Sequence, residues 1–202
     1  MDPSWSPDGR ELAFKRVAPC CEPAIDQLWL MNADGTNVRL LSPIRGSGNA
    51  LWNTVWSPDS KRLAFLAPGG VDQHFDVYVI HEEGTGQLNI SNSPEDEMWP
   101  SWSPDGMRIA FARMSPAANN AGTLVVVDSD GSDQHLLNGP PINSNAPVWS
   151  PDGTKVLAYA KDPDPRFDEN GAIAVFDPSA RDETTTIPAP LFTSASWQRL
   201  AP

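Results

Sequence analysis

The sequence is poor in the residues that build disulfide frameworks and metal sites. Of its 202 residues, two are cysteine and three are histidine. Cys20 and Cys21 are adjacent, so they cannot form a long-range disulfide with each other, and they lack the spacing of zinc ligands. We interpret them as a pair of loop thiols. His74, His81 and His135 would form a metal site only if the fold brought all three together, and we interpret them as loop or solvated residues.

Long apolar runs and catalytic signatures are missing as well. No stretch of 18 apolar residues occurs, so we expect no membrane insertion. Residues 1–4 have neither the basic region nor the apolar stretch of a secretory signal. The sequence contains no Gly-x-Ser-x-Gly nucleophile elbow, no His-Glu-x-x-His motif, no Walker A loop and no Rossmann fingerprint. It therefore predicts no enzymatic activity of its own and no cofactor.

Positive charge is also scarce. Lys and Arg total 14 against 26 Asp and Glu, which gives a formal net charge of −12. The resulting field repels phosphate backbones and anionic lipids. We therefore expect no binding to nucleic acid, and a neutral or cationic partner fits better.

Proline, glycine and tryptophan, by contrast, are plentiful. The 21 Pro and 14 Gly suit a chain that turns often, and eight Trp within 40% hydrophobic residues are ample for a core. Helical periodicity over ten or more residues appears nowhere, so we expect little or no helix. Composition alone favours an all-β fold.

One hairpin pattern recurs along the chain, most clearly at residues 99–111. In Ser-Pro-Asp-Gly, Pro fixes φ at the first turning position, Asp can bond to its own backbone, and Gly accepts a positive φ. The tryptophan before this turn recurs every 46 to 51 residues, at Trp5, Trp56, Trp102, Trp149 and, in a degenerate copy, Trp197. This spacing is typical of the blades of a β-propeller.

Each interval contains four strand-like segments, so the sequence predicts a β-propeller of four-stranded antiparallel blades. The blades are expected at residues 1–43, 44–93, 94–139 and 140–188, with one extra C-terminal strand in residues 189–202. Because each repeat buries its apolar face only against its neighbours, residues 1–202 should form a single domain. Residues 77–80 and 124–127 are nearly continuous apolar runs, as expected of strands covered on both faces.

Two positions depart from the repeat. Ser60 stands where the other turns have Gly, and a non-Gly residue in a left-handed conformation costs roughly 1 kcal/mol. The aromatic residue that falls nine positions after the Trp in the first three copies is replaced by Ala158 in the fourth, and Tyr159 follows it. Either a bulge absorbs this shift or the core is repacked there.

The Pro-x-Trp-Ser-Pro-Asp-Gly hairpin, the Asp-Gly turn some 30 residues later and the closing Leu-Ser or Ile-Ser segment resemble the WD40-like repeats of TolB-type β-propellers. The similarity covers essentially the whole chain. It implies a non-enzymatic propeller like the C-terminal domain of TolB, which binds proteins or ligands through loops on the blade faces. A periplasmic or extracytoplasmic location is also implied, with envelope lipoproteins and other Tol components as partners.

The same repeat occurs in other proteins, so three interpretations stay open. Besides a binding module, the chain could be the propeller of a carbohydrate-active lyase, or that of a serine peptidase whose catalytic domain is absent. A lyase would need several His, Tyr, Arg or Lys in the central cleft, and His and Tyr are scarce here. The third interpretation is a structural repeat fragment without a ligand.

Ring closure is the main topological question. TolB-like propellers are expected to have six blades, whereas this sequence supplies four and the first strand of a fifth, residues 192–197. The first repeat begins almost at Met1, which suggests a chain cut from something longer, while residues 195–200 look like the usual C-terminal finish of the family. We expect a fragment or an assembly completed by another chain, including a homo-oligomer, because open sheet edges invite pairing.

Binding residues are expected in loops that differ between the copies. The loops between second and third strands, residues 18–26, 68–75, 114–122 and 162–171, should emerge on one face. Near them, Arg113, Lys161 and Arg166 could receive an anionic group. Trp52 and Trp99 lie outside the repeated tryptophan column, and they either line the other face or are buried between blades.

The last of these loops also concentrates oxygen ligands. Asp162, Asp164 and Asp168 could hold Ca²⁺, a hard cation that takes six to eight oxygen ligands. Their spacing does not fit an EF-hand, and we favour a solvated acidic loop, with Asp168 as a candidate binding residue. A calorimetric titration with Ca²⁺ would distinguish the two interpretations.

Overall fold

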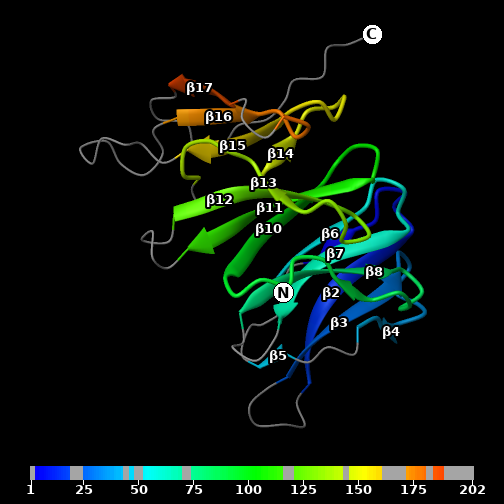
Figure 1. Ribbon diagram of the computed structural model, residues 1–202. Coiled ribbons are helices and arrows are strands. Elements are labelled where there is room, and N and C mark those ends of the chain that lie inside the picture. Colours follow the sequence, from blue (N-terminus) through cyan, green and yellow to red (C-terminus); the bar gives the residue numbers. More distant parts are fainter. Residues whose placement is uncertain are drawn as a thin grey trace.

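A computed structural model shows that the chain is all-β, as the sequence predicts (Figure 1). It describes residues 3–18, 25–42, 46–47, 52–69, 74–115, 121–142, 146–160, 172–180 and 184–188. Within these ranges no helix occurs. Figure 1 shows the sheets following one another in chain order, from the blue N-terminal sheet to the orange C-terminal one.

The strands form four antiparallel sheets, each built from consecutive strands, which are the expected blades. Blade 1 contains β1 (Ser4–Trp5), β2 (Glu11–Ala18), β3 (Ile25–Asn32) and β4 (Arg39–Leu40), and β5 (Gly46–Ser47) also pairs with β3. Blade 2 contains β6 (Trp52–Trp56), β7 (Arg62–Pro68), β8 (Phe75–His81) and β9 (Leu88–Asn89). Blade 3 contains β10 (Asp96–Trp102), β11 (Arg108–Ser115), β12 (Ala121–Asp128) and β13 (His135–Leu136). Blade 4 contains β14 (Val148–Trp149), β15 (Val156–Ala160), β16 (Ala172–Phe176) and β17 (Thr184–Pro188).

The repeated Ser-Pro-Asp turn has the same hydrogen bonds in each blade. In blade 4 the Ser150 hydroxyl donates to Asp152 Oδ1 at 2.6 Å and accepts the Lys155 amide at 2.9 Å. The turn glycine has a positive φ, 71° at Gly153, and Ser60 adopts the same conformation with a φ of 61°. The turn residues therefore serve the hairpin, and the strain expected at Ser60 is present.

In blades 2, 3 and 4 the hairpin tryptophan packs against the preceding blade, whereas Trp5 of blade 1 is 56% exposed. Trp56, Trp102 and Trp149 are 7%, 8% and 7% exposed. Each indole N–H donates to the backbone carbonyl just before the equivalent tryptophan of the preceding blade: Trp56 to Ser4 at 2.9 Å, Trp102 to Val55 at 3.2 Å and Trp149 to Ser101 at 3.0 Å. Three hydrophobic clusters fill the spaces between successive blades.

An arginine reinforces two of these junctions. Arg62 lies 4.9 Å from the Trp102 ring and donates to the Gly106 carbonyl at 2.7 Å. Arg108 lies 5.0 Å from the Trp149 ring and donates to the Gly153 carbonyl at 3.2 Å. A guanidinium stacked on an indole adds about 0.5–2 kcal/mol, so the junctions are held by packing and by directed contacts together.

The shifted fourth blade is repacked without a bulge in its central pair. β15 and β16 pair in unbroken register, and Ala158 faces blade 3 where the other blades present Phe. Phe176, which is 1% exposed, belongs to the same cluster. Its ring lies close to Gly139, and a Cβ on Gly139 would be only 2.5 Å from Phe176 Cε1. A large residue on β16 therefore restores the volume lost at Ala158. The predicted closing strand in residues 189–202 lies outside the described residues.

Candidate functional site

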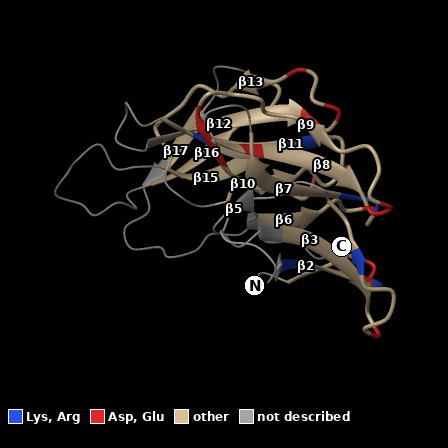
Figure 2. Cartoon of the chain, turned by 90° about the horizontal axis from the view of Figure 1, so that it is seen from below, with Lys and Arg blue, Asp and Glu red and all other residues tan. Residues whose placement is uncertain are grey.

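The first strands of the blades converge on a shared pocket of about 250 Å³. Residues from all four blades line it: Pro3, Ser4, Asn53, Thr54, Val55, Trp99, Pro100 and Ala146. None of these residues is charged, although the chain carries a net charge of −12. Figure 2 shows that many of the charged residues lie instead in turns and at strand ends. We call this site the axial pocket.

Backbone irregularities shape the axial pocket. The register of β6 shifts between Trp52 and Val55, and that of β10 between Met98 and Ser101. Asn53 and Trp99, each three residues before the hairpin tryptophan, have φ values of 51° and 55°. A left-handed conformation costs about 1–2 kcal/mol for a bulky residue such as Trp99, whereas Asn adopts it more readily, and bulges re-aim side chains. Such strain concentrates at functional sites, which supports a functional interpretation of this pocket.

Trp99 is the largest side chain of the axial pocket. It is half-buried, packs against the cluster between blades 3 and 4, and also lines the pocket. The sequence offered burial between blades and a position on a face as alternatives, and the structure places the residue in contact with both. Trp52 lies in β6 opposite Leu66, but its side chain is outside the described part of the chain.

Sequence reasoning missed Asn53, Thr54 and Ala146. The signal was available, because Asn53 and Ala146 stand at the same distance before their hairpin tryptophans as Trp99 does. Aromatic character drew attention to Trp99 alone. The repeat register therefore identifies the axial position better than residue type does.

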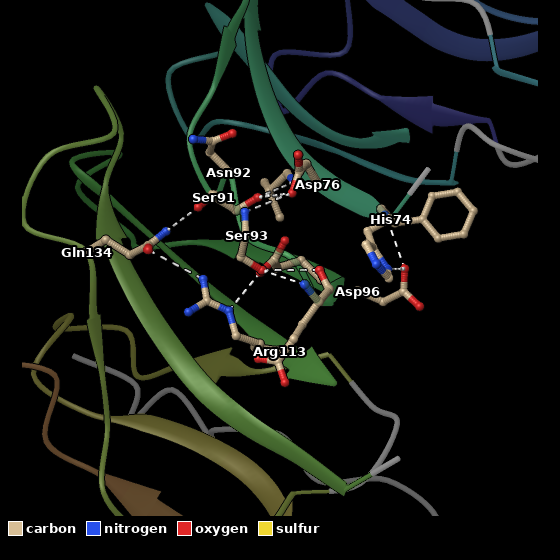
Figure 3. A network of polar contacts seen from close by, with 12 residues as sticks. His74, Asp76, Ser91, Asn92, Ser93, Asp96, Arg113 and Gln134 are labelled. Carbon is tan, nitrogen blue, oxygen red and sulfur yellow. Dashed lines mark hydrogen bonds and ion pairs between the residues drawn. The ribbon is translucent and has the colours of Figure 1, made fainter. Parts of the chain in front are cut away.

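A buried polar network lies at the junction of blades 2 and 3 (Figure 3). The side chains of Asp76 and Glu97 are almost fully buried. Glu97 Oε1 accepts from the Ser93 hydroxyl at 2.6 Å and from Arg113 Nε at 2.8 Å. The Asp76 carboxylate accepts from the Ser91 hydroxyl at 3.2 Å. Two acids from neighbouring blades thus lie close together, and one of them, Glu97, pairs with Arg113.

Burial makes one of these acids weak. It raises the pKa of Glu97 to about 7, and the neighbouring Asp76 carboxyl adds to the rise, while Ser93 and Arg113 act in the opposite direction. Glu97 Oε2 is buried without a hydrogen-bond partner. Glu97 therefore changes its charge near neutral pH, two residues from Trp99 on the same strand.

The other predicted site residues fall in two groups. Arg113 is paired with Glu97 and its side chain is only 16% exposed, so its guanidinium faces a protein carboxylate. The remaining predicted residues lie outside the described part of the chain: Lys161, Arg166, Asp168 and the calcium candidates Asp162 and Asp164. Within the described ranges no group of three or more His, Cys, Asp or Glu side chains is placed to hold a metal ion. No helix in that part of the chain is long and apolar enough to cross a membrane.

A wider depression of about 340 Å³ lies between the hairpins of blades 1 and 2. It is lined by charges of both signs, and these already pair with each other, as in the 3.1 Å ion pair between Lys61 and Glu82. Blade 1 has Glu11 where the next two blades place Arg62 and Arg108 across their junctions. The charges of this depression already pair within the protein, as Glu11 does with Arg39 at 2.6 Å, so we favour the axial pocket as the binding site.

Comparison with known proteins agrees with this architecture. Residues 1–153 match the TolB beta propeller domain family. Over 106 residues the chain is 31% identical to the Tol-Pal system protein TolB of Anaeromyxobacter dehalogenans, an alignment that covers 50% of this chain and 21% of that protein. The aligned part thus spans about a fifth of the relative's length.

Solved structures show the same fold. The putative TolB of Agrobacterium tumefaciens superposes with a TM-score of 0.65 at 22% identity, covering 92% of this chain and 63% of the other. An oligogalacturonate lyase in complex with manganese gives a TM-score of 0.69 at 15% identity, covering 99% and 55%. At such identities the likeness concerns the fold alone. The family match covers residues 1–153, and the four antiparallel blades joined by repeated tryptophan contacts agree with it. The chain therefore belongs to the TolB beta propeller domain family.

Proposed function

We propose that the chain is a non-enzymatic binding module that receives an extended, uncharged segment of another protein in the axial pocket. The observation that carries this proposal is the convergence of residues from all four blades on one uncharged pocket, where Asn53 and Trp99 have a positive φ. Pockets of this kind, mostly apolar with a few placed polar groups, are typical of ligand sites.

The lining suggests the chemistry of the ligand. Trp99, Pro3 and Pro100 offer flat apolar surfaces, and Asn53, Thr54 and Ser4 can donate or accept hydrogen bonds. Aromatic surfaces beside polar groups suit an extended peptide, whose backbone needs hydrogen bonds and whose side chains need apolar contacts. A charged segment would lose its hydration in this pocket without gaining a partner of opposite charge.

Similarity to TolB supports a partner in the cell envelope and a periplasmic location. This part of the proposal rests on the family and on the named relative, a Tol-Pal system protein. The family match is stronger support for a binding module than the resemblance to a lyase, which rests on the fold alone at 15% identity.

A peptide-display selection tests the proposal. We expect the wild-type chain to enrich uncharged peptides and Asn53→Asp to lose at least about ten-fold in affinity for them, because it places a charge in the pocket. Asp tolerates a left-handed φ, so this variant should keep its fold. Met107→Ala, at a residue that is 63% exposed on a hairpin, is the matched control. Equal affinity of Asn53→Asp and the control, or no enrichment at all, would refute the proposal.

A further inference from the structure

Two buried acids at the junction of blades 2 and 3 are one hydrogen short of a complete set of bonds. Asp76, 2% exposed on β8, accepts hydrogen bonds on both carboxylate oxygens, from the Ser91 hydroxyl at 3.2 Å and from Asn89 Nδ2 at 2.7 Å. Glu97, 0% exposed on β10, accepts on Oε1 alone, and its Oε2 is buried without a donor. A buried acceptor without a donor is costly, so this oxygen calls for a partner.

A single proton completes both the hydrogen bonds and the charge balance. The Asp76 side chain contacts the Glu97 carboxyl, and with both groups ionised two negative charges face the one positive charge of Arg113. A proton on Glu97 Oε2 can be donated to Asp76, which leaves one negative and one positive charge. Burial, with the contact to Asp76, raises the pKa of Glu97 to about 7, which agrees with this arrangement.

The other charged groups around the pair lie at its edge (Figure 3). Arg113 of β11 pairs with Glu97, and its second partner, Gln134, is neutral. Asp96, next to Glu97 on β10, has a side chain that is 39% exposed, and His74, just before β8, lies 3.6 Å from it. Because a histidine can also change its charge near neutral pH, His74 is the group that an experiment has to separate from Glu97.

The acid pair lies at one end of the bulge that shapes the axial pocket. Glu97 and Met98 pair with β11 just before the register shifts, and pairing resumes at Ser101. Trp99 and Pro100, which line the pocket, lie inside this break. The register gives these two residues no partner on β11, so they follow a displacement of Glu97.

We propose that one proton shared by Glu97 and Asp76 regulates the axial pocket, a proposal that rests on the proposed function of this pocket as the ligand site. While the proton is held, a carboxyl–carboxylate hydrogen bond joins β8 to β10, and Trp99 keeps its place in the pocket. Loss of the proton leaves two like charges in a buried space, so β10 moves away from β8 and displaces Trp99. Ligand affinity is therefore high at low pH and falls as the pH rises through about 7.

NMR of the ligand-free chain tests the shared proton without any ligand. The side-chain carboxyl carbon of Glu97 and the indole N–H of Trp99 should titrate together, with one midpoint near pH 7. In Glu97→Gln, which keeps a donor toward Asp76, the Trp99 signal should not change between pH 5.5 and 8.5. His74→Asn is the control and should titrate as the wild type does. A Trp99 signal that ignores pH, that titrates equally in Glu97→Gln, or that stops titrating in His74→Asn would overturn the proposal.

A second variant tests the pairing itself. Asp76→Asn offers an amide N–H to Glu97 Oε2 and removes the neighbouring negative charge, so the midpoint of the Glu97 carboxyl carbon should move to lower pH. An unchanged midpoint in Asp76→Asn would show that Asp76 does not share the proton.

Calorimetric titration with a display-enriched peptide tests the regulation. The wild type should bind at least about five-fold more weakly at pH 8.5 than at pH 6, whereas Glu97→Gln should bind equally at both. Equal wild-type affinity at both pH values, or the same decline in Glu97→Gln, would overturn the regulation and leave the binding role of the pocket intact. If no peptide is enriched, the proposed function fails and its regulation with it, whereas the NMR titration still decides whether the shared proton moves Trp99.

Discussion

Glu97→Gln should remove a pH dependence of stability that originates at the junction of blades 2 and 3. Glu97 is 0% exposed, and burial raises its pKa from the usual 4.5 to about 7. A carboxyl group whose pKa is higher in the folded state stabilises the fold while protonated. That contribution is fully present below about pH 4.5 and is lost as the pH rises through about 7.

The magnitude follows from the size of the shift. Each pKa unit corresponds to 1.36 kcal/mol, so a rise from 4.5 to about 7 corresponds to about 3 kcal/mol. Glutamine has the same shape, can accept from Ser93 and Arg113, and can offer its amide N–H groups to the Asp76 side. We therefore expect Glu97→Gln to match the wild type near pH 4.5 and to exceed its free energy of unfolding by about 3 kcal/mol at pH 8.

Urea unfolding at half-unit steps from pH 4.5 to 8.5 measures this difference. Subtracting the two curves removes the contributions that the proteins share and leaves that of Glu97 together with its contact to Asp76. Glu83→Gln, which removes an exposed carboxylate in a turn, is the control and should differ from the wild type by a constant amount. A difference between Glu97→Gln and the wild type that stays flat across this range would refute the assigned burial and pairing.

Three further substitutions probe the repeat contacts. Trp102→Phe removes the 3.2 Å hydrogen bond to the Val55 carbonyl and weakens the contact with Arg62, so urea unfolding should show a free energy of unfolding lower by about 1–3 kcal/mol. The exposed Trp5→Phe should lose less than about 0.5 kcal/mol, and equal losses in the two variants would contradict the interface. Ser60→Gly relieves the strain of a φ of 61° but removes the 3.1 Å hydrogen bond from the Asp8 amide. The free energy of unfolding should therefore rise by about 0.5 kcal/mol with a higher Tm, and a lower Tm would argue against strain at this turn. Gly69→Ala would place a Cβ 1.6 Å from Asp76 Oδ2, so thermal unfolding should show a loss of stability above about 2 kcal/mol. Stability close to that of the wild type would contradict the close packing of Gly69 on Asp76.

The fold could be predicted from the sequence because its repeat acts at two levels. Ser-Pro-Asp-Gly specifies a local turn, and the tryptophan before it specifies the packing against the preceding blade. Both signals recur in register, so each copy supports the others. The repacking of blade 4 could not be settled in this way, because a one-residue shift fits either a bulge or a compensating side chain. The unbroken register of β15 with β16, together with Phe176 filling the space beside Gly139, distinguishes the two.

The candidate site was predicted less well. Trp99 was identified as an aromatic residue outside the tryptophan column, but its place in the pocket depends on a bulge and a positive φ that no residue type announces. Arg113 was expected to await an anionic ligand, whereas a neighbouring strand supplies Glu97 at 2.8 Å. Cross-strand partners of this kind follow from register, which the sequence does not specify at a bulge.

Peptide titration followed by amide and indole NMR shifts tests the role of the axial pocket most directly. With a peptide enriched by the wild-type chain, we predict that the largest shifts occur at Ser4, Asn53, Thr54 and the Trp99 indole N–H, which come from three different blades. Shifts confined to the hairpin turns, or to residues 74–76 and 113–115 at the strand ends away from those turns, would contradict a binding site on the propeller axis.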